Sequence, residues 1–422
     1  MGLPASLSAV EPLLQSGESA EILLGILTYN DHSTAPALAR SLVEGCAKSF
    51  PDRRVLVVNC DGGSQDDTPR LIRDAVPSSV PVWTVRHPIV GSWHPPLSES
   101  GVPGRESAVQ SLVYLTEPVR ASACLVVDGN VKSDPTQWPQ CLVQPILEKG
   151  MDCVLPHFRR NRYEGTLTNT LLAPLTTALY GKRCPYHLGG AYAFSGELAR
   201  TKLTSLPWDE EIAQFGIDGW LTTAAVAEDM HVCQASLGPR VQPPKSPSDL
   251  SLVVAQAVGC IFHLMERYET AWEGAGRSVA IPVVGAPVEL GGEVGTIRTE
   301  RLADGFRQGL RDLLPVWQLV LSGDTLERIL ELGAEDREAF RFPASLWVQA
   351  VYDFALAYHD RLLHREHLLK ALTPLYLGYT ASFIADTRAQ TVDHVAQEFA
   401  RLTDRFESMK PYLTQRWRWK DG

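Results

Sequence analysis

The sequence predicts an α/β protein with a mostly parallel sheet, followed by a mainly α-helical C-terminal region. Short apolar runs such as Ile22–Thr28 end on polar loops and are followed by segments with helical spacing. Strands that alternate with helices in this way favour right-handed βαβ connections and a parallel sheet. Beyond residue 300, apolar residues recur every three or four positions, which is typical of packed helices.

Each expected strand is an apolar, β-prone run that stops at a polar or glycine-bearing stretch. The expected strands are Ile22–Thr28, Arg54–Asn59, Val82–Arg86, Cys124–Val127, Asp152–Leu155, the glycine-rich segment Gly189–Gly196, and His231–Ser236. Helical spacing lies between and after them. The expected helices are Pro36–Phe50, one from about Pro69, Ser107–Leu115, Trp138–Lys149, Leu167–Tyr180, Glu197–Leu203, Phe215–Ala227 and Leu250–Tyr268. The stretch His87–Gly104 is long and irregular, which favours a functional loop.

These elements predict four segments. Residues 1–20 are a lead-in, 21–275 the α/β domain, 276–300 a linker or extended arm, and 301–422 a helical domain. In the last segment, the helix face carrying Trp347, Val351, Phe354 and Tyr358 is expected to form core or a dimer surface rather than a cofactor site.

Composition limits the classes of function. The chain has 422 residues, 45% hydrophobic and 21% charged, with a formal net charge of −10. This acidic balance, without a clustered basic excess, argues against nucleic acid as a partner. The eight cysteines form no Cys-x-x-Cys pair, which is typical of reduced thiols in a cytoplasmic protein. We expect no transmembrane segment, because the longest apolar stretch, Leu252–Met265, is too short to span a bilayer.

Four polar loops fall where the carboxyl ends of parallel strands would gather them. They are Thr28–Asp31, Asp61–Thr68, Gly104–Glu106 and Asp128–Asn130. Ligands of open α/β sheets bind at this edge. Asp, Gly and Asn are also ordinary turn formers, so the last triplet alone is a weak signal and an ordinary turn is the alternative.

Three of these segments resemble a known family. Ile26–Asn30, Val58–Ser64 and Val126–Asn130 are similar to the nucleotide-sugar-binding half of a family-2-like glycosyltransferase of the GT-A fold. Matches at Gly189–Gly190 and Phe215–Asp218 extend the resemblance to the branch that includes mannosylglycerate synthase and glucosyl-3-phosphoglycerate synthase.

The resemblance implies a role for each matching position. Thr28 and Tyr29 would wrap the nucleobase, and Asp61 would accept hydrogen bonds from base or ribose, although without the resemblance a simple turn residue is an even alternative for Asp61. Asp128 and position 130 would hold Mg2+ or Mn2+ against the diphosphate, because two charged phosphates need a hard cation with oxygen ligands. Asp218, at the start of a helix, would bind acceptor hydroxyls or assist proton transfer, although a helix N-cap is an even alternative.

The chain departs from the family pattern at four site positions. Asn130 replaces the second carboxylate of an Asp-x-Asp motif, and Arg105 stands where a Gly-Lys-Gly loop is usual. Ala191 follows Gly189–Gly190, where an acid is usual, and the loop around Lys245 lacks the expected histidine. Either the metal site is weak or absent, with Arg105 and Lys245 neutralising the diphosphate directly, or catalysis has been lost.

The leading hypothesis is therefore a transferase that moves a hexose from a nucleoside-diphosphate sugar, of the UDP-glucose or GDP-mannose type, to a small polar acceptor such as glycerate or phosphoglycerate. Asp128 and Asp218 would be its catalytic residues, and Gly189, Gly190 and Asp218 would bind the acceptor. The alternative is a catalytically impaired relative that binds a sugar nucleotide or a partner. A sugar-phosphate nucleotidyltransferase is disfavoured, because Leu23–Asp31 provides no basic glycine-rich loop. A homodimer through the helical region is also compatible with the sequence.

Overall fold

The computed structural model describes residues 11–15, 17–87, 102, 104–184, 189–205, 208, 216–239, 250–286, 291, 297–336 and 339–417. The chain divides into two compact units, and each unit consists of three separate segments of the sequence. Unit 1 comprises residues 1–159, 188–245 and 281–288, and unit 2 comprises residues 160–187, 246–280 and 289–422. Residues 160–187 therefore belong with the C-terminal helices, although they lie inside the predicted α/β domain.

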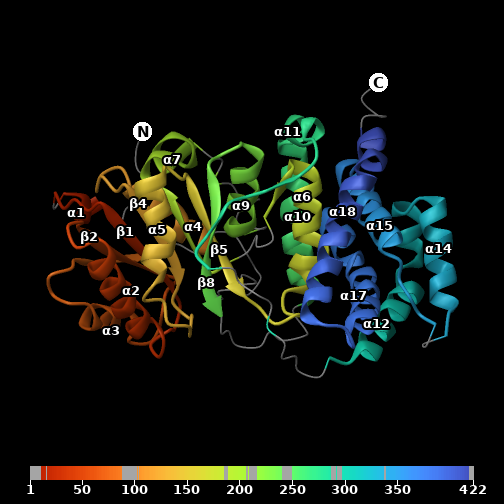
Figure 1. The fold of residues 1–422 in the computed structure, drawn as a ribbon, viewed down its shortest axis with the longest axis horizontal. Coiled ribbons are helices and arrows are strands. Elements are labelled where there is room, and N and C mark those ends of the chain that lie inside the picture. Colours follow the sequence, from red (N-terminus) through yellow and green to blue (C-terminus); the bar gives the residue numbers. More distant parts are fainter. Residues whose placement is uncertain are drawn as a thin grey trace. The chain divides into compact units, whose positions relative to one another are not determined.

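Unit 1 is built on a mixed, mostly parallel sheet with the strand order β10-β8-β5-β7-β4-β1-β2-β3 (Figure 1). Among the described strands of this sheet, β7 alone runs antiparallel, to both β4 and β5. The strands are β1 (Ile22–Thr28), β2 (Val55–Asp61), β3 (Val82–Arg86), β4 (Ala123–Asp128), β5 (Cys153–Arg159), β7 (Ala191–Ser195), β8 (Val232–Pro239) and β10 (Val283–Val284). The predicted fold class is confirmed, and the apolar runs expected as strands are all found in this sheet.

Helices cover both faces of the sheet. The helices α2 (Ala35–Ser49), α3 (Thr68–Ala75) and α5 (Trp138–Lys149) bury apolar residues in one core with β1, β2, β4, β5, β7 and β8. The other face carries α4 (Arg105–Leu115), which packs on β1, β2 and β4, with α7 (Gly196–Thr201) and α9 (Ile217–Ala227) beside it. A short helix, α1 (Glu11–Leu14), precedes β1.

Successive side chains of a strand point to opposite faces of the sheet. We call the face covered by α2, α3 and α5 the α2/α5 core and the opposite face, covered by α4, α7 and α9, the α4/α9 face. Leu125 and Val127 of β4 point into the α2/α5 core, so Asp128 belongs to the α4/α9 face. Likewise Ala191 and Ala193 of β7 lie in the α2/α5 core, which leaves Tyr192 on the α4/α9 face. An acid at position 191 would be driven into an apolar core, which gives a physical reason for the alanine there.

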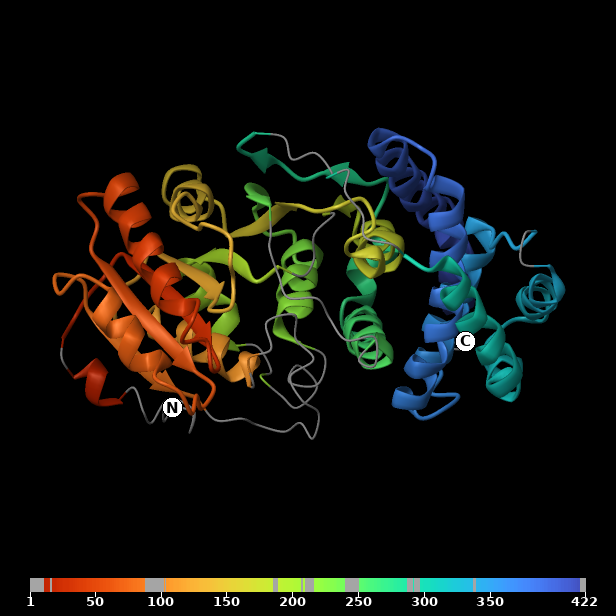
Figure 2. The same ribbon diagram turned by 90° about the horizontal axis from the view of Figure 1, so that it is seen from below.

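Unit 2 is a bundle of helices, drawn in yellow-green for α6 and in green to blue for the helices after residue 250 (Figures 1 and 2). Its helices are α6 (Ala173–Tyr180), α10 (Leu250–Arg267), α11 (Glu269–Gly274), α12 (Thr299–Asp312), α13 (Leu314–Val320), α14 (Gly323–Ala334), α15 (Ala344–His359), α16 (Arg365–Ala371), α17 (Thr373–Thr387) and α18 (Val392–Trp417). A π-helical turn, Thr168–Leu172, precedes α6 where the sequence predicts a regular helix. The strands β6 (Lys182–Arg183) and β9 (Val279–Ala280) pair in parallel.

Aromatic residues fill the core of unit 2. Trp347, Val351, Phe354 and Tyr358 are all fully buried, so the predicted aromatic face of α15 is core. Trp347 stacks on Tyr379 with ring centroids 5.3 Å apart. This face therefore stabilises the bundle by burial of large apolar surface.

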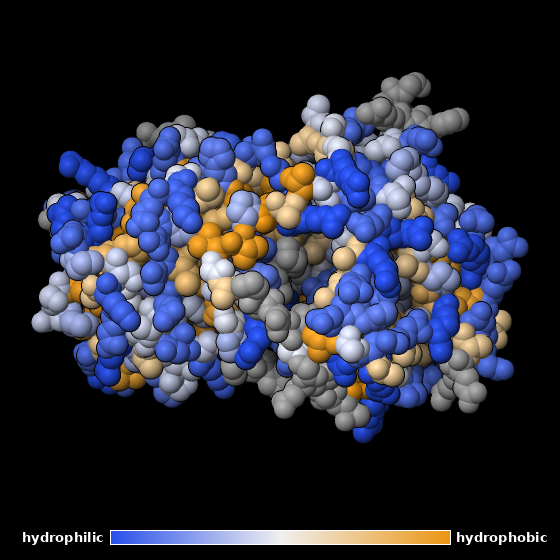
Figure 3. All heavy atoms as spheres, in the orientation of Figure 1, coloured by the Kyte–Doolittle hydropathy of each residue, from blue (hydrophilic) through white to orange (hydrophobic). Residues whose placement is uncertain are grey.

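The surface of the chain is mostly hydrophilic on the face drawn in Figure 3. The large apolar side chains exposed among the described residues are single residues on different elements: Val279, Val283, Leu319, Leu330 and Leu362. Within the described ranges, α10 is the one helix long and apolar enough to cross a membrane by length and composition, and 50% of it is buried inside the structure. A core helix of a soluble protein passes the same test. The cytoplasmic location and the homodimer stay predictions.

Candidate functional site

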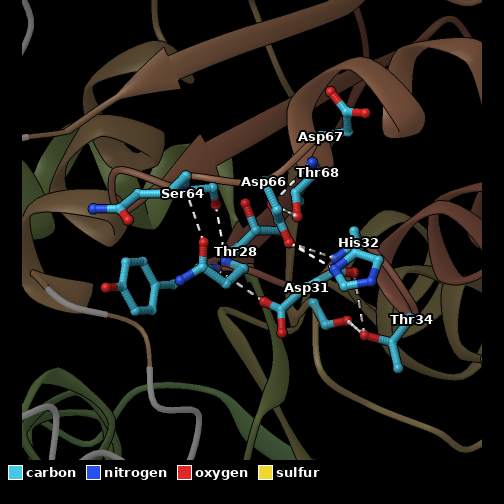
Figure 4. Close-up of polar contacts among 12 residues, drawn as sticks. Thr28, Asp31, His32, Thr34, Ser64, Asp66, Asp67 and Thr68 are labelled. Carbon is cyan, nitrogen blue, oxygen red and sulfur yellow. Dashed lines mark hydrogen bonds and ion pairs between the residues drawn. The ribbon is translucent and has the colours of Figure 1, made fainter.

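The loops after β1 and β2 are tied together at the carboxyl edge of the sheet (Figure 4). The backbone N–H of Asn30 donates to Ser64 Oγ at 2.9 Å, and the N–H of Gln65 donates to Asn30 Oδ1 at 2.8 Å. His32 Nδ1 lies 2.8 Å from Asp66 Oδ2. Asn30 has a positive φ of 55°, which asparagine tolerates better than most residues. The loops after β1 and β2 are therefore held together by direct hydrogen bonds.

The triplet after β4 is attached to the loop after β1 through Gly129. Its carbonyl accepts a hydrogen bond from Thr34 Oγ1 at 2.7 Å, and its N–H donates to Leu27 O at 2.7 Å. A Cβ at this position would stand 2.6 Å from Thr28 Cγ2 and 3.1 Å from Asp31 Oδ2. Glycine is therefore required here for close packing of the loops.

Thr28 and Asp61 lie at the centre of this edge, and both are buried. Thr28 Oγ1 donates to Asn59 Oδ1 at 2.8 Å. The Asp61 carboxylate accepts hydrogen bonds from the N–H groups of Gly63 at 3.1 Å and Ser64 at 3.0 Å. Asp61 thus caps its own turn, as an ordinary turn residue does, and its predicted contact with base or ribose stays a prediction.

Two polar groups at this edge were not singled out from the sequence. Burial raises the pKa of Asp31 to about 6, helped by the negative charges of Asp128, Asp66 and Asp61 and opposed by the hydrogen bond from the Tyr29 N–H. Asn59 Nδ2 is buried without a hydrogen-bond partner in the part of the chain that the structure describes. A short polar residue inside an apolar strand, such as Asn59, is the signal that could have found this group.

A buried ion triad lies on the α4/α9 face of the sheet. Arg105 Nε and Nη2 donate to the two oxygens of Asp218 at 3.0 and 3.1 Å, and Nη1 donates to Asp128 Oδ1. The side chains of Arg105, Asp128 and Asp218 are 4%, 1% and 17% exposed. We call these three residues the ion triad. It joins the first residue of α4, the last residue of β4 and the first turn of α9, which the sequence places up to 113 positions apart.

The electrostatics of the triad follow from its burial. Burial lowers the pKa of the Arg105 guanidinium, but the charges of Asp128 and Asp218 outweigh burial and raise this pKa above its ordinary value. Arg105 is therefore permanently charged. Burial also raises the pKa of the neighbouring Glu106 to about 7, against the attraction of Arg105.

Tyr192 adds a polar group to this region that sequence reasoning missed. Its side chain is 3% exposed, and its hydroxyl has no hydrogen-bond partner among the residues that the structure describes. Burial raises its pKa well above the ordinary value, with a further contribution from the negative charge of Asp218. The hydroxyl is therefore neutral and can donate a hydrogen bond, and it interacts electrostatically with the ion triad. The alternation of β7 after Gly190 is the signal that could have identified it.

The glycines predicted to bind an acceptor have backbone roles here. Gly190 O accepts a hydrogen bond from the N–H of Asp128 at 2.8 Å, which continues the pairing of β7 with β4. A Cβ on Gly189 would stand 2.1 Å from Pro156 Cγ, so the close approach of β5 requires a glycine. Gly190 lies next to Asp128, and the contact of either glycine with an acceptor stays a prediction.

The remaining predicted site residues fall into two groups. Tyr29 and Asn130 are partly exposed and follow β1 and β4 at the same edge. Lys245 lies outside the described residues, as do most positions of the irregular loop expected at 87–104. Their predicted contacts with a donor stay predictions.

The residues present do not fit a divalent cation. Asp128 has Arg105 as its ion-pair partner, and position 130 supplies an amide rather than a carboxylate. Among the described residues, no three His, Cys, Asp or Glu side chains form a group that could hold a metal ion. Mg2+ and Mn2+ prefer several oxygen ligands, usually including carboxylates.

The fold and this edge define an α/β protein with a mostly parallel open sheet and buried charged groups at the carboxyl ends of its strands. No protein-family model matches the chain, and no curated protein matches it.

Among solved structures, the chain is similar to glucosyl-3-phosphoglycerate synthase from Mycobacterium tuberculosis. The complex of that enzyme with Mn2+, UDP and phosphoglyceric acid is 21% identical over 63% of this chain and 82% of that chain, with a TM-score of 0.43. Its complex with Mn2+, UDP and glucosyl-3-phosphoglycerate is 20% identical over 64% and 86%, again with a TM-score of 0.43. At this identity the likeness concerns the fold, and it assigns no role to any residue of this chain.

Proposed function

We propose that this protein is a glycosyltransferase that moves a hexose from a nucleoside-diphosphate sugar to a small polar acceptor. The observation that carries the proposal is the convergence of the loops after β1, β2 and β4 on one edge, beside the buried ion triad. Such an edge is where open α/β sheets bind ligands. Buried charged residues in one place are costly for stability and therefore often mark a functional site.

The site residues divide by the loops that hold them. Thr28, Tyr29 and Asp61 would bind the nucleoside, because they belong to the two cross-linked loops. Asp128 would bind the ribose or the sugar, and Asp218 would bind the acceptor or take up its proton. With carboxylates on both sides, Arg105 holds these two acids at a fixed separation.

The diphosphate needs positive charge as well. Arg105 and Lys245 are the predicted donors to it, and Arg86 is a further candidate. Arg86 ends β3 opposite Asp61, and its Nη2 lies 3.4 Å from the position that a Cβ on Gly63 would take. Guanidinium groups bind phosphate oxygens in pairs, which suits this role.

Titration calorimetry with UDP-glucose and GDP-mannose tests the proposal, with release of nucleoside diphosphate measured after glycerate or 3-phosphoglycerate is added. Binding of one donor and release that depends on an acceptor would support transfer. An Asp218→Asn variant should bind the donor and lose turnover, whereas Asp67→Asn, an exposed acid in the same region, should change neither. Absence of binding by both donors would refute the proposal.

A second function is favoured by one specific observation. Arg105 is already paired with both acids to which the proposal assigns chemistry, so a protein that binds a sugar nucleotide without turning it over would have the same site. Donor binding without acceptor-dependent release, under all acceptors tested, would support this binding function instead.

A further inference from the structure

Arg105 lies between the carboxylates of Asp128 and Asp218. Its guanidinium is buried and contacts one carboxylate at the end of β4 and a second at the start of α9. Arginine at the first position of a helix is unfavourable for the helix dipole, since that end carries partial positive charge. Its position is therefore explained by the two acids and not by helix stability.

The ion triad disfavours a metal ion at Asp128 for electrostatic reasons. A divalent cation bound to this carboxylate would stand beside a buried guanidinium, and like charges repel strongly where water is excluded. The triad has one positive and two negative charges, so Arg105 already compensates one of the two carboxylates and the net charge of the triad stays negative. Asn130 offers only a weak carbonyl ligand in place of a second carboxylate.

We propose that Arg105 takes the place of a divalent cation at this site, as a positive charge that belongs to the protein and binds Asp128 and Asp218 together. This inference rests on the proposed function, because it names how the same site manages the charge of its donor. A guanidinium has five N–H groups, and the contacts with the two acids use three of them. Two remain to donate to oxygens of a bound sugar nucleotide.

The guanidinium of Arg105 differs from a metal ion in two ways: it carries a smaller charge, and a chelator cannot remove it from the protein. It supplies one positive charge where a metal supplies two, so the diphosphate requires a second basic group. Arg86 has no ion-pair or hydrogen-bond partner among the described residues and lies against the loop after β2. The site would therefore hold its donor equally well in a chelator and in Mn2+.

Direct binding of Mn2+ tests the inference without any substrate. Electron paramagnetic resonance of free Mn2+ is measured with the wild-type protein, Arg105→Lys, Arg105→Ala and the double variant Arg105→Ala/Asn130→Asp. We expect no stoichiometric binding of Mn2+ by the wild type or by Arg105→Lys. The double variant should bind Mn2+ with a dissociation constant at least about tenfold lower than that of the wild type, because its carboxylates have lost their cation. Circular dichroism and a melting curve establish that each variant is folded.

Two results would overturn the inference. One is a Mn2+ ion bound by the wild type and lost in Asp128→Asn, which requires no change at Arg105 and so holds even where Arg105→Ala fails to fold. The other is a folded double variant that binds Mn2+ no better than the wild type.

A second measurement separates this inference from the proposed function. UDP-glucose is titrated into the wild type in EDTA and in Mn2+, and we expect equal dissociation constants. A dissociation constant lowered tenfold or more by Mn2+ would contradict the replacement of the cation. If UDP-glucose and GDP-mannose bind under neither condition, the proposed function fails, while the Mn2+ measurement still decides whether Arg105 excludes a metal.

Discussion

Replacement of Arg105 by alanine should destabilise unit 1 severely and in a pH-dependent way. The change removes the cation between Asp128 and Asp218, which are 1% and 17% exposed. Breaking a buried ion pair by removing one partner costs about 3–5 kcal/mol, because a charge stays buried without compensation. Here two negative charges would remain together, so we expect the upper part of that range at pH 8.

The pH dependence follows from the sign of the pKa change. Without Arg105, the pKa of Asp128 in the folded state should rise above its value of about 3.9 in the unfolded chain. Stability is then highest at low pH and is lost as the pH rises through the raised pKa. The difference between the variant and the wild type should therefore shrink from pH 8 to pH 5.

Urea unfolding followed by circular dichroism, together with hydrogen exchange of the β4 amides, measures this difference. Arg105→Lys should fall between the two proteins, because it keeps the charge but loses the paired contact with Asp218. Arg40→Ala, on the exposed side of α2, is the matched control. A loss below about 1 kcal/mol that is the same at both pH values would refute a charge-balancing role for Arg105.

Three further changes test other parts of the site. Asp31→Asn should stabilise the protein by about 1–2 kcal/mol at pH 7.5 and hardly at pH 4, because a pKa raised to about 6 means that stability is lost between pH 4 and 6; urea unfolding at both pH values checks this, with Asp67→Asn as control. Gly129→Ala should cost about 1–3 kcal/mol, since a Cβ would stand 2.6 Å from a methyl group of Thr28. Thermal melts measure this loss, with Gly274→Ala as the control. A Cβ at Gly274 meets nothing within 4 Å, so this change should be neutral or stabilising. Tyr192→Phe should leave the free energy of unfolding within about 0.5 kcal/mol, because the hydroxyl has no partner to lose, and a larger loss would mean that this hydroxyl is bonded.

The sequence predicted the local elements of unit 1 well, because each strand is a short apolar run with a clear polar end. Val82–Arg86 and Trp138–Lys149 have the predicted bounds. The antiparallel direction of β7 could not be predicted, since alternation along a strand indicates which face each side chain meets but not the direction of the neighbouring strands. The same is true of the division into units, because residues 160–187 read as ordinary helix and loop in the sequence.

The site was predicted as a set of positions but not as a set of contacts. The loops at Thr28, Asp61 and Asp128 do lie together, because parallel strands end at one edge. The sequence singled out Arg105 as a basic group for phosphate and Asp218 as an acceptor residue. Their ion pair spans 113 positions, and no local pattern reports such a distance.

The interleaving of the units also has a consequence for biosynthesis. Helix α6 is complete by residue 180, and every one of its side chains is buried, yet the helix packs against α18, which begins at residue 392. At about 5–20 residues per second, a ribosome needs roughly 10–40 s to reach that helix. During this interval α6 has no completed bundle to enter. The emerging chain therefore presents an apolar segment that must be shielded until the last helix leaves the ribosome.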